Sequence, residues 1–244
     1  MSARWVDTHA HLERYDPPLR AEILERARAE GVAVIGVSTD VPAAITLVGM
    51  KGLAGVAIGV HPSHAGLSNP SELADLAAHA KNVVAIGECG FDDDGSAPEL
   101  QVGAFEAQTA LARANALPLI LHIAGTNSWE RLLECETSLD GLIVVRHYFT
   151  GDPAQAAWHA ERGHYLAFGN PLRRDTSLRE IAAGYPADRL LVETDSYPFP
   201  NRRTEPRDVA RVAETLALVR GWTFAEASAQ LLENTRSAFP RLTL

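Results

Sequence analysis

Six histidine and carboxylate residues have the types and the spacing of metal ligands. Imidazole and carboxylate groups together suit Zn²⁺, Mn²⁺ or Fe²⁺, and they suit Mg²⁺ where carboxylates and water dominate. His9 and His11 are two positions apart, so on an extended strand both imidazoles point the same way and can bind one ion. A single histidine is usually structural, but a set of this size predicts a divalent-metal site that activates water. The predicted ligands are His9, His11, Glu88, His122, His147 and Asp195.

Glu193 and Asp195 share the same two-residue spacing, so either carboxylate could bind metal. We favour Asp195, because the more terminal residue would lie nearer the mouth of the site and could accept a proton from metal-bound water. Glu193 would then orient a ligating histidine from behind. Asp195 and Glu88 are the predicted catalytic residues.

Short apolar, β-branched runs alternate with longer helical patterns along the whole chain, which is typical of repeated βα units. About eight strands are expected, the number that closes a barrel, and their continuous apolar character fits parallel strands buried on both faces. We therefore predict an α/β fold, a single TIM-like (β/α)8 barrel over residues 1–244. An open doubly wound sheet is the alternative, but no Gly-rich dinucleotide-binding turn follows the first strand. The expected strands are Arg4–Asp7, Val32–Ser38, Val56–Val60, Val83–Gly87, Pro118–Leu121, Leu142–Arg146, Tyr165–Phe168 and Leu190–Val192.

The barrel explains how ligands far apart in the sequence could meet. We expect the six residues to follow the carboxyl ends of strands one, four, five, six and eight. In a parallel barrel all of these ends lie on one face, where catalytic sites are built.

Several helices have recognisable starts. Asp152 is a predicted N-cap followed by a proline, and Thr223 with Glu226 forms a predicted capping box. Over 99–116, the apolar stripe expected to pack on the barrel is Leu100, Ala104, Ala107, Leu111 and Ala114. His79, His159 and His164 are expected to be solvent-exposed and uninvolved in the site.

Composition and charge narrow the class of protein. The 244 residues carry 31 acidic and 22 basic side chains, a net charge of −9, which argues against nonspecific coating of DNA. It does not exclude a nuclease, because bound divalent ions would add positive charge locally.

Cys89 and Cys135 have no metal-finger spacing and are expected to be buried thiols. With no signal-like or membrane-length apolar run, we expect a cytoplasmic protein without a membrane partner.

A series of motifs runs in order along essentially the whole chain. The motifs are Asp7-Thr8-His9-Ala10-His11, Gly59-Val60-His61-Pro62, Gly87-Glu88-Cys89-Gly90-Phe91-Asp92, His122, His147-Tyr148-Phe149-Thr150-Gly151, Glu193-Thr194-Asp195 and Glu233-Asn234-Thr235. Together they resemble the TatD-type deoxyribonucleases of the amidohydrolase superfamily.

The resemblance implies a TIM-like barrel that binds about two divalent ions, of unknown identity among Mg, Mn and Zn. It implies that His9, His11 and Asp195 hold one ion, that Glu88 bridges, and that His122 and His147 hold the second. The implied reaction is phosphodiester hydrolysis of DNA, often from a 3′ end.

The chain departs from that family outside the predicted ligands. The usual His-x-Arg is His122-Ile123-Ala124 here, so an arginine that could contact phosphate is missing. The segment 92–98 is short and acidic, and the usual Arg-Asn-Glu-Pro reads Arg203-Thr204-Glu205-Pro206. These changes concern substrate choice, and the shortened loop resembles TatD-like members of antiphage defence operons.

Substrate contacts are expected from loops on the same face. Arginines in the loops after strands seven and eight suit phosphate, although a solvated surface is an equal alternative. Tyr197 and Phe199 could stack bases or anchor their loop. His61 could contact phosphate or orient a ligand. The arginines are Arg173, Arg174, Arg202, Arg203 and Arg207, of which Arg173, Arg202 and Arg203 are the preferred candidates together with Tyr197 and His61.

These residues and motifs are compatible with three alternative functions. The leading prediction is a metal-dependent nuclease, a 3′–5′ exonuclease preferring single strands or ends of DNA, with RNA as a further substrate. The second is another amidohydrolase-type enzyme acting on a small ester, amide or phosphoester. There Glu88 must serve as any bridge, because neither Lys51 nor Lys81 is at the carboxyl end of a strand. The third is a binding module for nucleic acid or protein. A monomer or small homo-oligomer is expected, with proteins of the same operon as candidate partners.

Overall fold

The computed structural model describes residues 3–200 and 204–244 and contains one eight-stranded sheet with the order β1 to β8. Every neighbouring pair is parallel, and β1 also meets the segment after β8 through a parallel bridge between Ala10 and Ser196. The predicted α/β barrel is therefore confirmed. The strands are β1 (Trp5–Ala10), β2 (Val32–Val37), β3 (Gly55–Ile58), β4 (Val83–Asp92), β5 (Leu119–Ala124), β6 (Val144–Arg146), β7 (Tyr165–Phe168) and β8 (Leu190–Val192).

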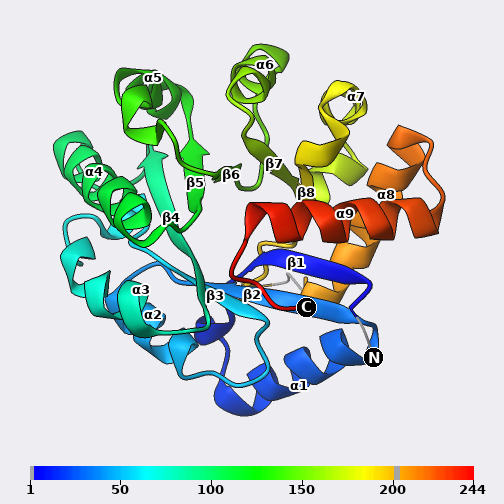
Figure 1. Cartoon of the computed structure of the whole chain (residues 1–244), viewed down its shortest axis with the longest axis horizontal. Coiled ribbons are helices and arrows are strands. Elements are labelled where there is room, and N and C mark those ends of the chain that lie inside the picture. The colour runs from blue at the N-terminus through cyan, green and yellow to red at the C-terminus, as the bar shows by residue number, and fades with distance from the viewer. Residues whose placement is uncertain (1–2, 201–203) are drawn as a thin grey trace.

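Helices lie around the outside of the strands, and the chain passes round the barrel in sequence order (Figure 1). The last helix, α9, packs against β1 and β8 near the point where the sheet closes. The helices are α1 (Pro17–Ala29), α2 (Val41–Val48), α3 (Ala74–His79), α4 (Pro98–Asn115), α5 (Thr126–Glu134), α6 (Pro153–Glu161), α7 (Thr176–Gly184), α8 (Val209–Arg220) and α9 (Phe224–Ala238). No helix within the described ranges is both long and apolar enough to cross a bilayer.

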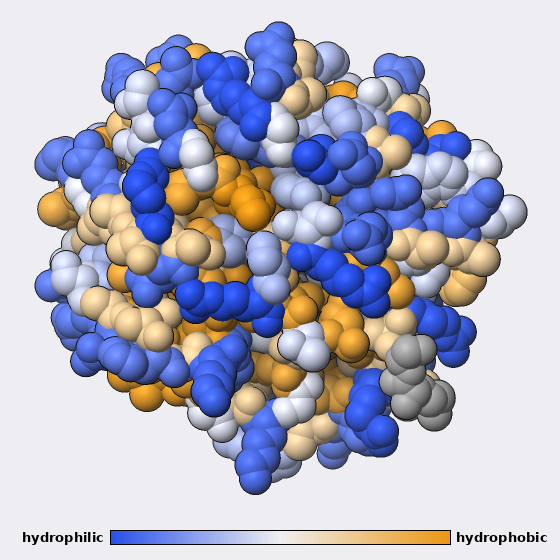
Figure 2. Space-filling model, viewed as in Figure 1, coloured by the Kyte–Doolittle hydropathy of each residue, from blue (hydrophilic) through white to orange (hydrophobic). Residues whose placement is uncertain are grey.

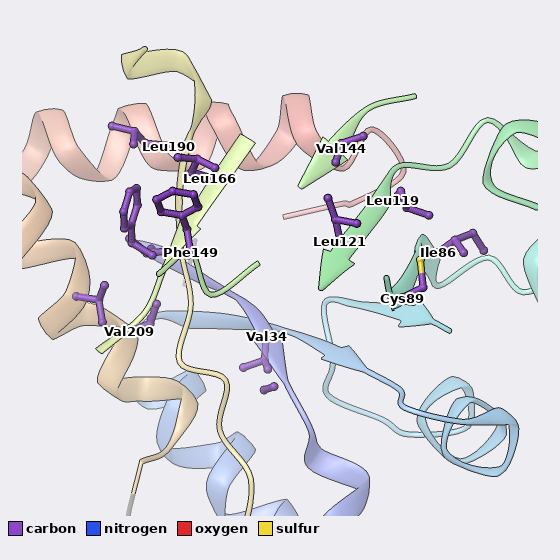
Figure 3. Close-up of a cluster of buried hydrophobic side chains, with 14 of the residues drawn as sticks. Val34, Ile86, Cys89, Leu119, Leu121, Val144, Phe149, Leu166, Leu190 and Val209 are labelled. Carbon is purple, nitrogen blue, oxygen red and sulfur yellow. The ribbon is translucent and has the colours of Figure 1, made fainter. Parts of the chain in front are cut away.

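The strands bury side chains on both faces, which gives two apolar clusters. Successive residues of a strand point to opposite faces, so Val34 joins one cluster and Ile35 the other. The smaller cluster takes side chains from all eight strands and from Phe239, which follows α9. Figure 3 shows part of the larger cluster, where Phe149, Leu166 and other strand and loop residues pack together. On the face drawn in Figure 2, hydrophilic side chains cover most of the periphery.

Three strands continue further than the sequence predicted. β1 runs on to Ala10, β4 to Asp92 and β5 to Ala124, so His9, Glu88 and His122 lie within strands, not after them. The apolar runs end earlier, but the hydrogen-bonded ladder does not, because Gly90 still pairs with His122. Gly90 has a φ of +144°, and a side chain there would collide with the His122 carbonyl group. Backbone contact between β4 and β5 therefore depends on glycine at this position.

The predicted apolar stripe of α4 is correct only in part. Ala104 is buried and Leu111 packs partly buried against the core, but Leu100 is 46% exposed. The buried face instead includes Gln101 and Gln108. Gln101 exchanges hydrogen bonds with the Asp92 backbone, and its Nε2 also donates to the Ser96 carbonyl. The buried face of α4 therefore includes polar side chains that bind the backbone of neighbouring loops.

The predicted helix caps are confirmed: Asp152 accepts a hydrogen bond from the Gln155 amide, and Thr223 forms a capping box with Glu226. The expected exposure of His159 and His164 is wrong. Both are buried, and their Nδ1 atoms are 3.0 Å apart. The two rings share a hydrogen bond through these atoms, whereas Nε2 of His159 is buried without a partner among the described residues.

Two smaller expectations concern the exposure of His79 and of the two cysteines. His79 is exposed, as expected, at the end of α3. Cys89 is buried, but Cys135 is only half-buried at the end of α5, so burial was correctly predicted for one thiol of two.

Candidate active site

The carboxyl ends of the strands surround a cavity of about 1050 Å³. Five of the six predicted ligands line this cavity. The sixth, His9, is fully buried and is not among the lining residues. The lining ligands are His11, Glu88, His122, His147 and Asp195. The structure thus brings together all the residues that the sequence analysis selected as ligands.

Glu88 lies at the centre of this cluster, and its two oxygens face different histidines. Oε2 is 3.2 Å from Nε2 of His9 and 3.4 Å from Nε2 of His11. Oε1 is 2.7 Å from Nδ1 of His122 and 2.9 Å from Nε2 of His147. One carboxylate therefore connects two pairs of imidazoles, the arrangement needed to bridge two cations.

The donor atoms fall into groups that fit a metal ion. His9, His11 and Asp195 have donor atoms within 4.8 Å of one another, as do His9, Glu88 and His147. Asp195 Oδ1 is 3.3 Å from His11 Nε2. Mixed imidazole and carboxylate donors suit a divalent transition metal.

A third group contains a residue that the sequence analysis did not select. Asp92 Oδ2 is 3.2 Å from Nε2 of His122, and these two residues form a donor group with His61. His61 Nε2 is also 3.6 Å from Glu88 Oε1. Asp92 is four residues after Glu88 in β4, and alternate residues of a strand share a face. That spacing is the signal that could have identified it.

Two buried carboxylates support the cluster from behind. Glu193 Oε1 is 3.1 Å from Nδ1 of His147 and accepts a 2.7 Å hydrogen bond from the Tyr148 amide. Asp7, which was also not selected, accepts from the amide and the hydroxyl of Thr194 and from the amide of His9. Asp7 thereby joins the end of β1 to the segment after β8. A carboxylate behind a ligating imidazole fixes the orientation of the ring.

Burial and close charges shift the pKa values in the cluster. Burial alone would raise the pKa of Glu88, but His147 and His9 hold this pKa well below its ordinary value. Burial also opposes the charge of His147, yet Glu88 and Glu193 raise its pKa to about 10. Burial lowers the pKa of His61 to about 4, so this imidazole is neutral at pH 7. The cluster therefore keeps its central carboxylate ionised.

The residues expected to contact substrate lie in different places. Tyr197 lines the main cavity, with its ring 6.3 Å from that of His11, and His61 lines the same cavity. Arg14, which the sequence analysis did not select, also lines it and lies over the Tyr197 ring. Phe199 is 59% exposed and is not among the lining residues.

The three described arginines of the last loops do not share one surface. Arg173 and Arg174 line a separate pocket of about 460 Å³ with Arg211, and Tyr148 borders both pockets. Arg207 instead pairs with Glu30 at 3.2 Å and with Glu205 at 3.1 Å. Arg202 and Arg203 lie outside the described residues.

The short acidic segment 92–98 is hydrogen-bonded to the start of α5. Asp93 accepts hydrogen bonds from the amides of Asn127 and Ser128 and from the Ser128 hydroxyl, so it caps the start of α5. Ala124 lines the main cavity.

The profile of the family described as TatD related DNase matches residues 6–240. The chain belongs to the TatD family. A metal-dependent hydrolase of Bacillus subtilis named YabD is 36% identical over 251 residues, which cover 96% of this chain and 98% of YabD. A TatD protein of Erwinia amylovora, named a 3′-5′ ssDNA/RNA exonuclease, is 38% identical over 200 residues, 74% of this chain and 76% of the relative.

Solved structures agree with this TatD assignment. The TatD homologue YJJV of Escherichia coli has a TM-score of 0.84 and 27% identity, with 98% of this chain and 99% of that protein covered. A Deinococcus radiodurans lactonase has a TM-score of 0.66 at 16% identity, covering 98% of each chain, and shows the shared barrel alone. As a TatD-family protein, the chain is a metal-dependent hydrolase that acts on ester bonds.

Proposed function

We propose that this enzyme hydrolyses phosphodiester bonds of DNA from the 3′ end, preferring single strands, with RNA as a further substrate. The observation that carries the proposal is the position of Glu88 between two pairs of histidines at an open cavity. Its relative from Erwinia amylovora, named as an exonuclease of this kind, supports the choice of reaction.

Two divalent ions are part of the proposal, and the donor set suits them. His9, His11 and Asp195 would hold one ion, His122 and His147 the other, and Glu88 would bridge. Bound there, such ions supply two effects: they lower the pKa of a coordinated water and neutralise charge on the phosphate. Among residues 3–200 and 204–244, none forms a hydrogen bond with the buried Nδ1 of His9, which leaves this nitrogen for a bound ion.

The protein's own groups would orient the cluster and move the proton. Burial disfavours the charge of Asp195, but the hydrogen bond with His11 keeps the pKa of Asp195 below its ordinary value. This carboxylate is therefore ionised at neutral pH and can accept a proton at the cavity, where its side chain is 17% exposed. Glu193 would keep the ring of His147 fixed during the reaction.

The substrate strand would reach the cluster through the main cavity. His61 and Tyr197 line it and would contact the terminal nucleotide. Arg173 in the neighbouring pocket would contact a phosphate further along the strand. Because the net charge is −9, binding would depend on such local cations, and not on a broad basic surface.

A labelled-strand assay tests the proposal. Purified enzyme with Mg²⁺, Mn²⁺ or Zn²⁺ is expected to shorten a 5′-labelled single strand stepwise, and Asp195→Asn is expected to lose about 100-fold or more in rate. Glu233→Gln, a change in an exposed part of α9, is the matched control and should keep full activity. Equal rates for Asp195→Asn and the parent enzyme would remove the assignment. Internal cuts without stepwise products would contradict the exonuclease reaction.

A further inference from the structure

The main cavity is larger than the metal cluster and continues between β5 and β6 toward α5 and α6. Figure 1 shows α5 and α6 as neighbours outside these two strands. Both apolar side chains and the carboxylate of Glu130 line this part of the cavity, and Arg146, at the end of β6, lines it too. We call this part the tryptophan chamber, made of Ile123, Ala124, Trp129, Glu130, Leu133, Arg146 and Trp158.

Arg146 is the unusual member of the chamber. It is only 5% exposed, and its guanidinium donates to the carbonyl groups of Ile123, at 2.6 Å, and His147. No carboxylate in residues 3–200 or 204–244 lies within ion-pair distance of it. Glu193 and Glu88 favour its positive charge from beyond that distance. A buried cation with no direct ion pair is unfavourable, and an anion entering the cavity would supply a direct partner.

The tryptophan chamber also has an aromatic part. The rings of Trp129 and Trp158 meet edge to face, with centroids 5.3 Å apart. The Arg162 guanidinium covers the Trp158 ring, 3.9 Å from its centroid, and holds it in place. Indole surfaces of this kind pack well against nucleobases. The small side chain of Ala124 leaves the chamber open toward the cluster, two residues from His122 in β5.

We propose that the tryptophan chamber binds one nucleotide next to the metal cluster, with its phosphate at Arg146 and its base against Trp129 and Trp158. The proposal rests on the proposed function and specifies where the strand lies. A planar guanidinium can donate two parallel hydrogen bonds to a phosphate. Inorganic phosphate or a nucleoside alone would satisfy only half of this site.

Nucleotide binding can be measured without catalysis. In EDTA, thymidine 5′-monophosphate is expected to quench tryptophan fluorescence and to bind about tenfold more tightly than thymidine or inorganic phosphate. Trp129→Phe and Trp158→Phe should each remove part of the quenching, whereas Trp222→Phe should not, because Trp222 does not line the cavity. Equal binding of the nucleotide and of phosphate would overturn the proposal.

Two variants test the two halves of the chamber. Arg146→Met should weaken nucleotide binding by about tenfold or more and leave thymidine binding unchanged, since only the phosphate contact is lost. Ala124→Leu keeps Arg146 but adds bulk to the chamber wall, and it should weaken both ligands. Arg189→Met is the control, because Arg189 is an arginine outside the cavity. Unchanged nucleotide binding in both chamber variants would refute the proposal.

Kinetics separate contact from positioning, since Arg146 also donates to the His147 carbonyl. A substrate contact predicts that Arg146→Met raises KM for oligonucleotides by about tenfold while kcat and metal content stay close to those of the parent. A loss of metal and of kcat at constant KM would mean that Arg146 only positions His147, and would overturn the proposal. Arg146-dependent nucleotide binding without DNA cleavage would refute the proposed function alone, and DNA cleavage indifferent to Arg146 would refute the chamber alone.

Discussion

Carboxylates one or two positions apart in this enzyme contact different parts of the structure. Asp92 faces His122 in the cluster, whereas Asp93 caps α5. Glu193 contacts the far nitrogen of His147, whereas Asp195 reaches His11 at the cavity. The difference follows from backbone direction, since neighbouring or alternate side chains point to different elements once the strand has ended.

Replacement of Glu193 by glutamine tests support from behind the cluster. We expect Glu193→Gln to keep the fold and to lower metal affinity by about 10- to 100-fold, because an amide fixes His147 less firmly than a carboxylate does. Isothermal titration with Zn²⁺ or Mn²⁺ measures the change, with the exposed Glu233→Gln as control. Unchanged affinity would show that Glu193 does not support the site.

At the scale of elements, α4 helps to position the site through hydrogen bonds to a neighbouring loop. Gln108 accepts from the Val60 amide at 2.7 Å and donates to the Val60 carbonyl at 3.1 Å. Val60 directly precedes His61, so this buried glutamine fixes the start of a cavity loop.

The expected cost of losing this contact is large for one side chain. Gln108→Ala should lower the free energy of unfolding by about 2–3 kcal/mol, because two hydrogen bonds are lost and the Val60 amide is left buried without a partner. Urea unfolding measures it. Glu106→Ala, an exposed change on the same helix, should be close to neutral. A small effect in Gln108→Ala would mean that water replaces the amide.

The buried histidine pair between α6 and β7 predicts a pH-dependent stability. Burial lowers the pKa of His164 to about 4, whereas a histidine in the unfolded chain titrates near 6.5. Between these values the unfolded chain binds more protons, so stability falls as the pH falls.

This contribution is about 2 kcal/mol between pH 6.5 and 5. His164→Asn should reduce the loss of unfolding free energy between pH 7 and 5 by that amount, measured by urea unfolding at each pH. His79→Asn, which changes an exposed histidine, should leave the loss unchanged. The same slope in His164→Asn and the parent enzyme would contradict the assignment.

At the scale of the whole molecule, metal binding should couple to folding. The predicted ligands come from both the first and the last strands, so only the folded barrel assembles them. An ion at 100 times its Kd adds about 2.7 kcal/mol of stability. Adding Mn²⁺ or Zn²⁺ to EDTA-treated enzyme should therefore raise Tm by about 5–10 °C.

Calorimetry with and without metal measures this effect. Asp195→Asn should show a smaller increase in Tm, because one ligand is lost. An increase of the same size in Asp195→Asn would place the stabilising ion elsewhere, and no increase in the parent enzyme would contradict coupling to this cluster.

The amino-acid sequence by itself determined the barrel and the order of its candidate ligands. Apolar runs such as Tyr165–Phe168 and the cap at Asp152 act over a few residues, so short-range patterns identify them. Motif order then singled out His9, Glu88 and their companions.

The tertiary structure alone decided where strands end and what each polar side chain contacts. The continuation of β4 to Asp92, the burial of His159 and the carbonyl partners of Arg146 all depend on residues distant in sequence. A ladder or a buried polar group is stable only when its partner is supplied by another element, and local periodicity carries no information about that partner.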